Sequence, residues 1–385
     1  MNLLLLASLT VIAVMADEDP NAVFQESLRS FSSKIYKELA DSSPGNFLAC
    51  PLSSELVLAM VLNGARDQTA QQLAHAISVP NDLATTNKIV NSAISSIKTG
   101  STYTLKTVNK IFVSNDTTIK SGFAKTAAEI FKSSVGTVDF KNKQASVDHV
   151  NAWAADNTEN RITNLLTTQD IKDDTRAILL NAIYFQATWA KRFHEENTIE
   201  KPFYTSPTKT SPVKMMEQTS TFEYLDQPNA QFLKMSYLGT DAVMVVVLPK
   251  EKDGLSKLED QIDNVLSAKN FEHKKVHVLF PKFTMDTKIK MKPLLERLGV
   301  IDLFKPTADL TDLSDNRLYI SEVVQKNYIE VNEKGTIAAS ATAAIAGVGA
   351  GYNPEEPIEF AVDHPFIYYI WSPTGIMFVG RLYEP

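Results

Sequence analysis

The chain has 385 residues, of which 44% are hydrophobic and 22% charged, and its formal net charge is −7. This is the composition of an ordinary soluble globular protein, and the acidic balance argues against general nucleic-acid binding. The length fits either two or three average domains or one unusually large domain. Cys50 is the only cysteine, so no disulfide can form within the chain and the fold has to rest on its core. Since Cys50 lies in an apolar stretch, we predict that it is a small buried hydrophobe.

The N-terminus is typical of a secretory signal peptide at residues 1–16. An apolar run occupies residues 3–14, and small residues stand at Ala13 and Ala16. The run is too short to be a membrane anchor, and the C-terminus carries no retention signal of the KDEL type. We therefore expect a secreted, extracellular protein without a membrane partner. A sequon beginning at Asn115 is a candidate glycosylation site in such a protein.

In chain order, the apolar patterns predict helices early and strands late, which is an α+β fold. Apolar residues recur at the spacing of an amphipathic helix over residues 24–39. Residues 57–62 are too uniformly hydrophobic for a surface helix and should be buried. Later apolar runs are typical of strands, and they lie at residues 177–185, 242–248, 276–280, 366–370 and 376–379. No internal repeat, long linker or abrupt change of charge divides the chain, so we predict one domain over residues 17–385.

The twenty residues between Lys334 and Glu355 carry no charge, and ten of the fifteen at positions 337–351 are Ala or Gly. By composition alone this segment also fits a linker between folded parts. If it enters a sheet as a strand, alternate residues face one way. One face would then hold only small, uncharged residues, namely Thr336, Ala338, Ser340, Thr342, Ala344, Ala346 and Val348. Because a bulky or ionised side chain would oppose burial, this is the pattern that a loop needs if it is to become a strand.

Residues 318–344 closely resemble the distal hinge region of serpins, the serine protease inhibitors. The matching hinge positions are Glu333, Gly335, Thr336, Ala338, Ala339, Ser340 and Ala341. Further blocks that resemble serpin signatures follow one another in family order, at residues 46–53, 62–73, 150–166, 181–193 and 364–381. One departure is Cys50, where the family usually has Ser before the proline. The resemblance spans nearly the whole mature chain.

This resemblance implies the serpin fold, with three β-sheets and about nine helices in one domain. An exposed reactive-centre loop at about residues 333–357 would stand above a five-stranded central sheet. Native serpins are metastable because this sheet can accept the loop as a further strand. About fifteen residues gaining ladder hydrogen bonds, at roughly 1 kcal/mol net each, can outweigh the ordering of a tethered loop. Insertion should therefore be strongly downhill once the loop is cut.

The resemblance also implies roles for four residues of the central sheet and its support. Ser53, Asn181 and Gln325 match the shutter beneath the sheet, and Trp189 matches the breach where insertion begins. Many relatives have His in place of Gln325, but an amide can likewise both donate and accept hydrogen bonds. An ordinary aromatic core residue is the simpler alternative for Trp189.

The sequence shows no pattern typical of an enzyme, so we expect no catalytic residues, no metal and no cofactor. Gly347, Gly349 and Gly351 mimic a dinucleotide-binding turn, but no helix can begin before the Asn–Pro pair that follows. His273 and His277 are four residues apart on a predicted strand, which would not bring them together as a helix would, and no zincin motif is present. Neither a nucleophile elbow nor a Walker loop occurs.

The hinge favours an inhibitor over the other roles that members of this family play. Inhibitory serpins resemble this chain at Gly335, Thr336 and the four residues 338–341, whereas non-inhibitory members often have charged, bulky or proline residues there. We therefore expect a monomeric suicide inhibitor that forms a covalent acyl-enzyme complex with a target serine protease. A binding, carrier or storage protein is the alternative, because the fold alone does not establish inhibition.

Two counts along the loop disagree on the scissile bond. The usual span of about seventeen residues from Glu333 places it between Gly349 and Ala350, while the family's spacing back from Pro365 reaches Pro354. We prefer the count from the hinge, because the inserted length fixes how far the protease is carried. Few serine proteases also accept proline at the cleavage position.

Neighbouring bonds after Val348, Ala350 or Tyr352 stay open as alternatives. No Lys or Arg lies between Lys334 and Glu355, so a trypsin-like target, which requires a cation for its acidic pocket, is not expected. Small residues favour elastase-like or subtilisin-like proteases, and Tyr352 keeps a chymotrypsin-like target open.

Overall fold

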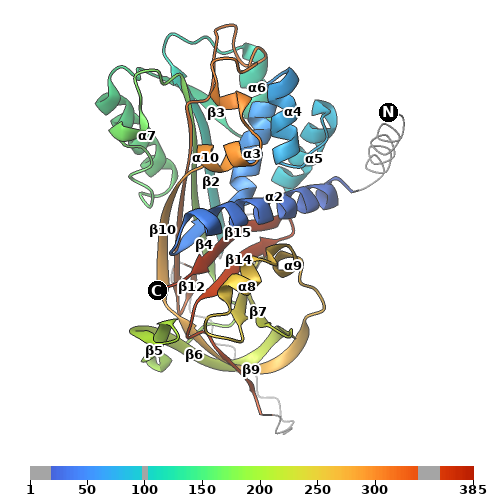
Figure 1. Ribbon diagram of the computed structural model, residues 1–385, viewed down its shortest axis with the longest axis vertical. Helices are drawn as coiled ribbons and strands as arrows, with labels where there is room; N and C mark the ends of the chain where they lie inside the picture. Colours follow the sequence, from blue (N-terminus) through green and yellow to red (C-terminus); the bar gives the residue numbers. More distant parts are fainter. Residues whose placement is uncertain (1–18, 98–102, 337–355) are drawn as a thin grey trace.

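The computed structural model describes residues 19–97, 103–336 and 356–385. Nine α-helices lie in this part of the chain, most of them in its first half (Figure 1). They are α2 (Pro20–Ser42), α3 (Pro51–Leu62), α4 (Asp67–Ala76), α5 (Leu83–Ser96), α6 (Ser121–Glu129), α7 (Lys143–Asn157), α8 (Leu255–Glu259), α9 (Ile262–Leu266) and α10 (Lys292–Arg297). Three 3-10 helices occupy Thr168–Asp170, Glu195–Asn197 and Asp302–Phe304. None of the helices in the described ranges is long and apolar enough to cross a membrane.

The strands of the described ranges are concentrated in the second half of the chain. They are β1 (Phe47–Ala49), β2 (Tyr103–Ser114), β3 (Ser134–Val138), β4 (Ala177–Thr188), β5 (Ile199–Ser206), β6 (Lys209–Asp226), β7 (Ala230–Ser236), β8 (Val243–Pro249), β9 (Glu272–Pro281), β10 (Phe283–Lys290), β11 (Glu322–Asn332), β12 (Gly335–Thr336), β13 (Ile358–Ala361), β14 (Phe366–Ser372) and β15 (Gly375–Leu382). The sequence-based predictions of strands at residues 177–185, 242–248, 276–280, 366–370 and 376–379 are confirmed by β4, β8, β9, β14 and β15.

The strands form three sheets, as predicted. The central sheet has the order β10-β11-β12-β4-β2-β3, in which β12 has only two residues and the other five strands are longer. The remaining strands are joined in the order β1-β15-β14-β8-β7-β6-β9-β13, with β5 also paired to β6. Two sheets share this set through β6, a strand of 18 residues that pairs with β9 along most of its length and with β7 at its end.

Helices cover both faces of the central sheet. In Figure 1 its strands run vertically between α7 on one side and α3, α4 and α5 on the other. On the core face lies α3, whose twelve residues are all buried, so the predicted burial of residues 57–62 is confirmed. On the outer face, α7 and the segment after it pack with Phe112, Ile178, Leu180, Ala182 and Val324 in a separate apolar cluster.

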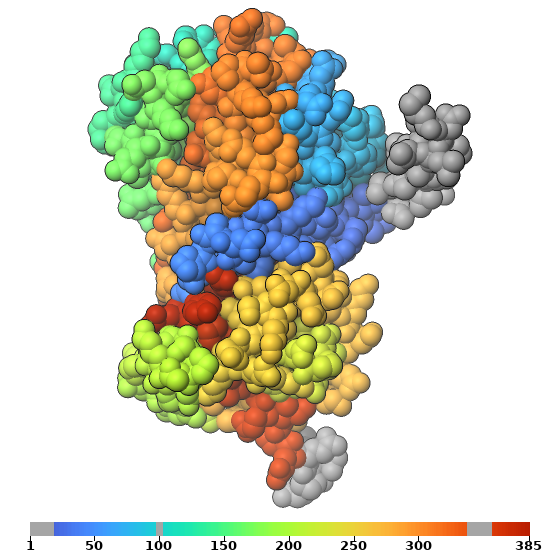
Figure 2. Space-filling model, in the orientation of Figure 1, coloured from blue at the N-terminus to red at the C-terminus, as the bar shows by residue number. Residues whose placement is uncertain are grey.

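The long helix α2 confirms the amphipathic pattern predicted for residues 24–39. Asp19 caps it by accepting a hydrogen bond from the Asn21 N–H at 3.1 Å, and Pro20 provides a first residue whose missing N–H costs nothing. Phe24, Leu28 and Phe31 are fully buried along one stripe. Figure 2 shows α2 as a blue band across this face of the molecule, between the upper helices and the gold α8–α9 region below.

A single apolar cluster connects residues from Val23 to Leu382, so distant parts of the chain share one core. Cys50 is fully buried in it as a free thiol, and burial raises the pKa of that thiol to about 12. The prediction for this residue is therefore confirmed.

Candidate functional site: the seam between β4 and β11

The central sheet has one unusual boundary, between β4 and β11, which we call the seam. Over most of its length the two strands pair directly in parallel, with residues 322–328 of β11 against residues 178–184 of β4. Above this ladder they separate, and β12 lies between them. Gly335 pairs with Asn332 on one side and Thr188 on the other, so the hinge already begins a new strand.

The chain reaches this position by a tight turn at Glu333 and Lys334, directly after β11 ends. The Lys334 carbonyl accepts a hydrogen bond from the Trp189 N–H at 3.0 Å, and the Glu333 carbonyl accepts one from the Phe193 N–H at the same distance. The predicted loop therefore starts inside the sheet, since Glu333, Gly335 and Thr336 are buried.

Gly335 is required by this turn. Its φ of +144° lies in the region that favours glycine, and a Cβ there would stand 2.2 Å from the Ala187 carbonyl oxygen. Any other residue would push β12 away from β4.

Aromatic rings support the hinge at the breach. Trp189 stacks on Tyr237 with ring centroids 4.6 Å apart, and its indole N–H donates to the Asn332 carbonyl at 3.0 Å. The Tyr237 hydroxyl lies 3.0 Å from the Thr336 hydroxyl, and both residues are almost fully buried. Thr336 thus faces the core side of the sheet.

Glu333 fixes the turn from the opposite side. Lys282 Nζ lies 2.9 Å from its carboxylate, and the Thr198 hydroxyl donates to the same group at 2.7 Å. Burial by itself would raise the pKa of Glu333, but these two donors lower it below its usual value. The carboxylate is therefore ionised at neutral pH and holds the start of the hinge in place.

An amide network closes the lower part of the seam on its core side. Gln325 of β11 pairs in register with Asn181 of β4, and the Gln325 amide donates to Asn181 Oδ1 at 2.9 Å. Asn181 in turn donates to Ser53 of α3 and to Asn109 of β2. The sheet and its supporting helix are thereby joined at one buried point.

Gln325 also holds the start of α3. Its side-chain oxygen accepts from the Cys50 N–H at 2.9 Å, while its nitrogen faces the Cys50 carbonyl at 2.9 Å and the Ser54 hydroxyl at 2.7 Å. The backbone of Cys50 supplies these contacts, so the departure from Ser at this position does not disturb them.

Reasoning from the sequence singled out Ser53, Asn181 and Gln325, which the structure brings together, and Trp189, which it places at the other end of the seam. It missed Asn109, Tyr237, Lys282 and Thr198. Asn109 shares the inward face of β2 with Ile111 and Val113, a signal that alternation could have given. The other three come from strands or loops remote in the chain and carry no local signal.

The rest of the predicted site lies outside the described residues. This applies to the hinge residues Ala338, Ala339, Ser340 and Ala341, and to the candidate cleavage positions Val348, Gly349, Ala350 and Tyr352. Residues 1–16 are also outside them. Asn115 is described, and it is exposed in the turn that follows β2. No group of His, Cys, Asp or Glu side chains suited to a metal ion occurs among the described residues.

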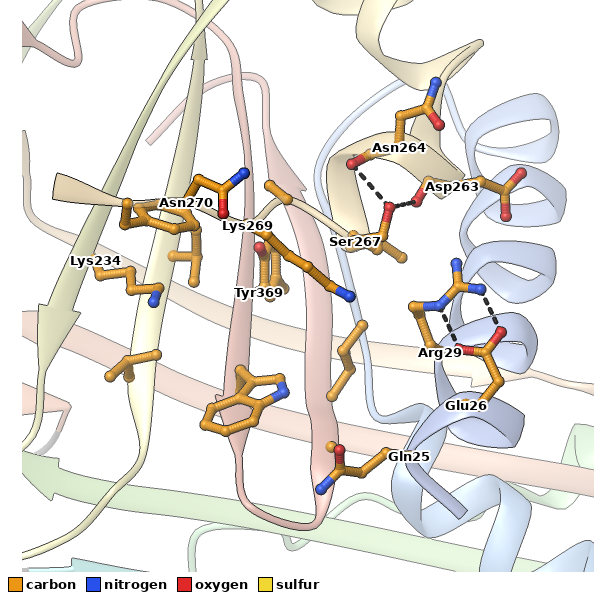
Figure 3. A pocket seen from close by; sticks show the side chains of 18 of the residues that line it. Gln25, Glu26, Arg29, Lys234, Asp263, Asn264, Ser267, Lys269, Asn270 and Tyr369 are labelled. Atoms are coloured by element: carbon orange, nitrogen blue, oxygen red, sulfur yellow. Dashed lines mark hydrogen bonds and ion pairs between the residues drawn. The ribbon is translucent and has the colours of Figure 1, made fainter. Parts of the chain in front are cut away.

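A pocket of about 970 Å³ lies away from the seam, between α2, the segment after α9 and strands of the shared set. Its floor includes Val243, Tyr369 and Trp371. Figure 3 shows Lys269 extending across it toward α2, where Glu26 and Arg29 form an ion pair of 2.5 Å. The pocket thus combines an aromatic floor with charges of both signs at its rim.

The central sheet thus combines a direct parallel ladder between β4 and β11 with the two-residue strand β12 between them at one end. Comparisons with known proteins identify the family. A family model described as Serpin (serine protease inhibitor) matches residues 26–385. Leukocyte elastase inhibitor A of Mus musculus is 37% identical over 377 residues, covering 92% of this chain and 97% of that protein. Antichymotrypsin-2 of Bombyx mori is 30% identical over 366 residues, covering 92% and 96%.

Among solved structures, Serpin48, a highly specific serpin of the insect Tenebrio molitor, is similar with a TM-score of 0.87 and 32% identity. The match covers 94% of this chain and 98% of that one. The chain belongs to the serpin family, whose members are protease inhibitors and generally not catalysts.

Proposed function

We propose that this protein is a secreted suicide inhibitor of serine proteases that works by trapping an acyl-enzyme and inserting its cleaved loop into the seam. The observation that carries this proposal is β12. Two hinge residues already occupy strand positions between β4 and β11, directly above a ladder that has to part for the rest of the loop.

Extending the register of β12 shows where the loop would go. Thr336 pairs with Ala187, so each later residue would pair with the next β4 residue down, and residue 345 would reach Ile178. Thr342 would then lie beside Asn181 on the core face. Because Thr336 and every second residue after it are small and uncharged, this face could be buried at no desolvation cost for charge.

The protease would supply the chemistry. Its nucleophile attacks a loop carbonyl, for which we favour Gly349, and the resulting acyl-enzyme is carried along as the loop inserts. Insertion separates seven register pairs of the parallel ladder, together with the Gln325 to Asn181 hydrogen bond. It replaces them with two antiparallel ladders, which makes the inserted state the more stable one. In this role the chain itself is not an enzyme.

The target class follows from the loop sequence. The small residues around Gly349 favour an elastase-like or subtilisin-like protease, and Tyr352 allows a chymotrypsin-like one. Two relatives carry names in keeping with this, an elastase inhibitor and an antichymotrypsin. No basic residue is present for a trypsin-like pocket.

Secretion is proposed from the leader-like residues 1–16, with a monomer as the working form and neither nucleic acid nor membrane as partner. The exposed position of Asn115 in a turn suits a glycan. Secretion from cultured cells, with the N-terminus read by mass spectrometry and the mass compared before and after deglycosylation, tests these points. An uncleaved residue 1 in the secreted protein would contradict them.

A carrier protein is the second candidate, and the pocket beside α2 is the observation that favours it. The pocket has aromatic residues at its floor and both acidic and basic side chains at its rim, which suits a flat amphipathic small molecule. A carrier need not insert its loop, so binding of small molecules without any covalent protease complex would support this role instead.

The deciding experiment incubates the protein with elastase, chymotrypsin and trypsin separately. We expect a complex that survives denaturing electrophoresis with elastase or chymotrypsin and none with trypsin. Mass spectrometry of the released C-terminal peptide locates the cleaved bond. Cleavage of the loop by elastase or chymotrypsin without any complex would exclude inhibition of these classes and favour the carrier role.

A further inference from the structure

The segment after α7, residues 158–176, crosses the outer face of the seam, and we call it the strap. Its apolar side chains Ile162, Leu165, Leu166 and Ile171 pack in one cluster with Leu180 of β4 and Val324 of β11. The strap therefore covers both strands that have to separate for insertion.

One end of the strap is attached to the half of the sheet that contains β4. Asn151 of α7 exchanges two hydrogen bonds of 2.9 Å with the backbone of Leu166. The same helix packs on β2, where Phe112 contacts Trp153 with ring centroids 5.6 Å apart. Since β2 and β4 share a long antiparallel ladder, this end of the strap would move with β4.

Further along, the strap is attached to the opposite half of the sheet through Asp170, before it leads into β4. This carboxylate is 2% exposed, and it lies 2.6 Å from Lys288 Nζ and 2.9 Å from Lys290 Nζ, both on β10. It also accepts hydrogen bonds from the N–H and the hydroxyl of Thr167, at 2.9 and 2.8 Å. Burial alone would raise the pKa of Asp170, but the two lysines and Thr167 lower it well below its usual value. The ion pairs are thus fully formed at neutral pH.

Opening of the seam would strain this arrangement. β10 and β11 are joined by eight register pairs and would move together. A new strand widens the sheet by about 4.8 Å. Asp170 lies only four positions after the anchor at Leu166, and residues Thr168–Asp170 form a 3-10 turn. Either this turn unwinds or Asp170 leaves its two lysines.

We propose that Asp170 is a clasp that holds the strap across the closed seam, and that its release is part of the barrier to loop insertion. The proposal rests on the proposed inhibitory function and names a regulator of the same site. Asp170 would act through the strap and would not touch the protease. Asp170 would oppose insertion on the outer face of the sheet. The pair of Gln325 and Asn181 would oppose it on the core face.

The strength of the clasp would affect both the rate of loop insertion after cleavage and the rate at which the seam of the uncut protein opens. An inhibitor has to insert its loop before the acyl-enzyme is hydrolysed, so a weaker clasp would favour trapping. The same weakening would let an uncut chain open its seam more often, and a foreign strand could then enter. Uptake of a strand by the uncut protein is therefore the direct measure of the clasp.

The test uses a synthetic peptide with the sequence of residues 337–349 and the full uncut protein. Asp170→Asn removes the charge but keeps an oxygen for Thr167. We expect it to bind the peptide roughly tenfold faster than the wild type or more, because a buried charge pair is lost from the closed state only. Lys290→Gln, at a half-exposed position that tolerates the change, should give a smaller increase.

Asp286→Asn is the matched control. Asp286 pairs with Lys326, so this ion pair joins β10 to β11 within one half of the sheet and does not cross the seam. Its uptake rate should stay within about twofold of the wild type. Equal rates for Asp170→Asn, Lys290→Gln and the control would overturn the clasp.

Peptide uptake needs no protease, so the clasp and the proposed inhibition can fail separately. Faster uptake by Asp170→Asn in a protein that forms no covalent complex would support the clasp and remove the inhibitory role. If the protein forms covalent complexes but Asp170→Asn takes up the peptide no faster than the wild type, the inhibitory role would be supported and the clasp would be excluded.

Discussion

The two ends of the seam differ in how they are held. At the breach, β4 and β11 are already apart, and the space between them is filled by β12 under the stacked rings of Trp189 and Tyr237. At the shutter, the strands are in direct contact, and an amide network ties Gln325 to Asn181 and to α3. Under the proposed mechanism, the breach would admit a new strand and the shutter would oppose it.

In the proposed mechanism, this difference would give insertion a direction. A strand that enters at the breach needs to break only the next pair of the ladder at each step, because its own ladder grows behind it. Gln325 and Asn181 form the fourth of the seven ladder pairs counted from the breach, so the shutter would be reached after the first three pairs have parted. By this mechanism, the seam would be closed in the native protein and would still open from one end.

The largest effect is expected at the breach, from Thr336→Arg. The Thr336 side chain is fully buried against Tyr237, and an arginine there would carry an unpaired charge into the core at a cost of several kcal/mol. We expect β12 to be expelled, the covalent complex with the target protease to be lost, and the loop to be cleaved as an ordinary substrate. Denaturing electrophoresis after incubation with the protease measures this.

Ile337→Arg is the matched control for that variant, because alternation along a strand that continued β12 would direct residue 337 away from the core face. It should retain most of the complex formation. If Thr336→Arg inhibited as well as Ile337→Arg, the breach would have no part in the mechanism.

At the shutter, Gln325→Leu should destabilise the uncleaved protein by about 2–4 kcal/mol, since it leaves several buried polar groups without a partner. The effect on the cleaved, inserted form should be smaller, because the bond to Asn181 is already broken there. Urea unfolding of both forms gives the two values. Asn63→Leu, which removes an amide pair with Asn87 remote from the seam, should affect both forms equally.

The shutter should also respond to pH through α3. Glu55 is fully buried on this helix, and burial raises its pKa to about 8. Ser27 stands 2.5 Å from the Glu55 carboxyl and 2.7 Å from the Ile77 carbonyl. The single hydroxyl proton of Ser27 can serve only one of these, so a protonated Glu55 that donates to Ser27 satisfies all three groups.

The sign of this pH effect follows from the raised pKa. Between the ordinary pKa near 4.5 and the folded value near 8, the native state binds a proton that the unfolded state releases. The free energy of unfolding should therefore fall as pH rises from about 4.5 to 8, by a few kcal/mol. Glu55→Gln should remove this dependence, and a wild-type curve that coincides with that of the variant would contradict the assignment.

The smallest effect on stability is expected at β13, a strand that belongs to neither the breach nor the shutter. His277 of β9 lies between two carboxylates, with Nδ1 2.8 Å from Glu359 and Nε2 3.0 Å from Glu217, and the pKa of His277 is raised by these contacts. The stabilisation should be complete below pH 6.5 and lost as pH rises through the raised pKa, at less than about 1 kcal/mol because the cluster is partly exposed.

Amide hydrogen exchange of β13 across this pH range measures the effect. Exchange should become faster at high pH than the intrinsic rate change explains, and His277→Gln should abolish the excess. An excess that persists in the variant would assign the pH effect to another group.

The sequence was sufficient to predict the elements that local patterns determine. The uniform hydrophobicity of α3 and the apolar runs of β4 and β8 identified buried elements correctly. The uncharged segment after Lys334 has the residue pattern of a loop that can become a strand. The resemblance to serpins identified Ser53, Asn181 and Gln325. Local patterns could not have predicted that these residues are in contact, because they are distant in the chain.

Other features depend on register and on turns that no local pattern determines. The turn at Glu333 and Lys334 places β12 in the sheet. Only the folded structure shows that Lys282 and Thr198 contact the Glu333 carboxylate and hold this turn. Asp170 is another case, because its neighbours Asp173 and Asp174 look equally acidic in the sequence. Only the fold shows that Asp170 alone of the three is buried against two lysines.

The central claim is that the seam accepts the cleaved loop, and thermal unfolding before and after a cut within residues 337–355 tests it most directly. With roughly ten new ladder bonds at about 1 kcal/mol each, and about 2 °C per kcal/mol for a protein of this size, the melting temperature should rise by roughly 20 °C. An unchanged or lower melting temperature in the cleaved protein, with the cut confirmed by mass spectrometry, would contradict the claim.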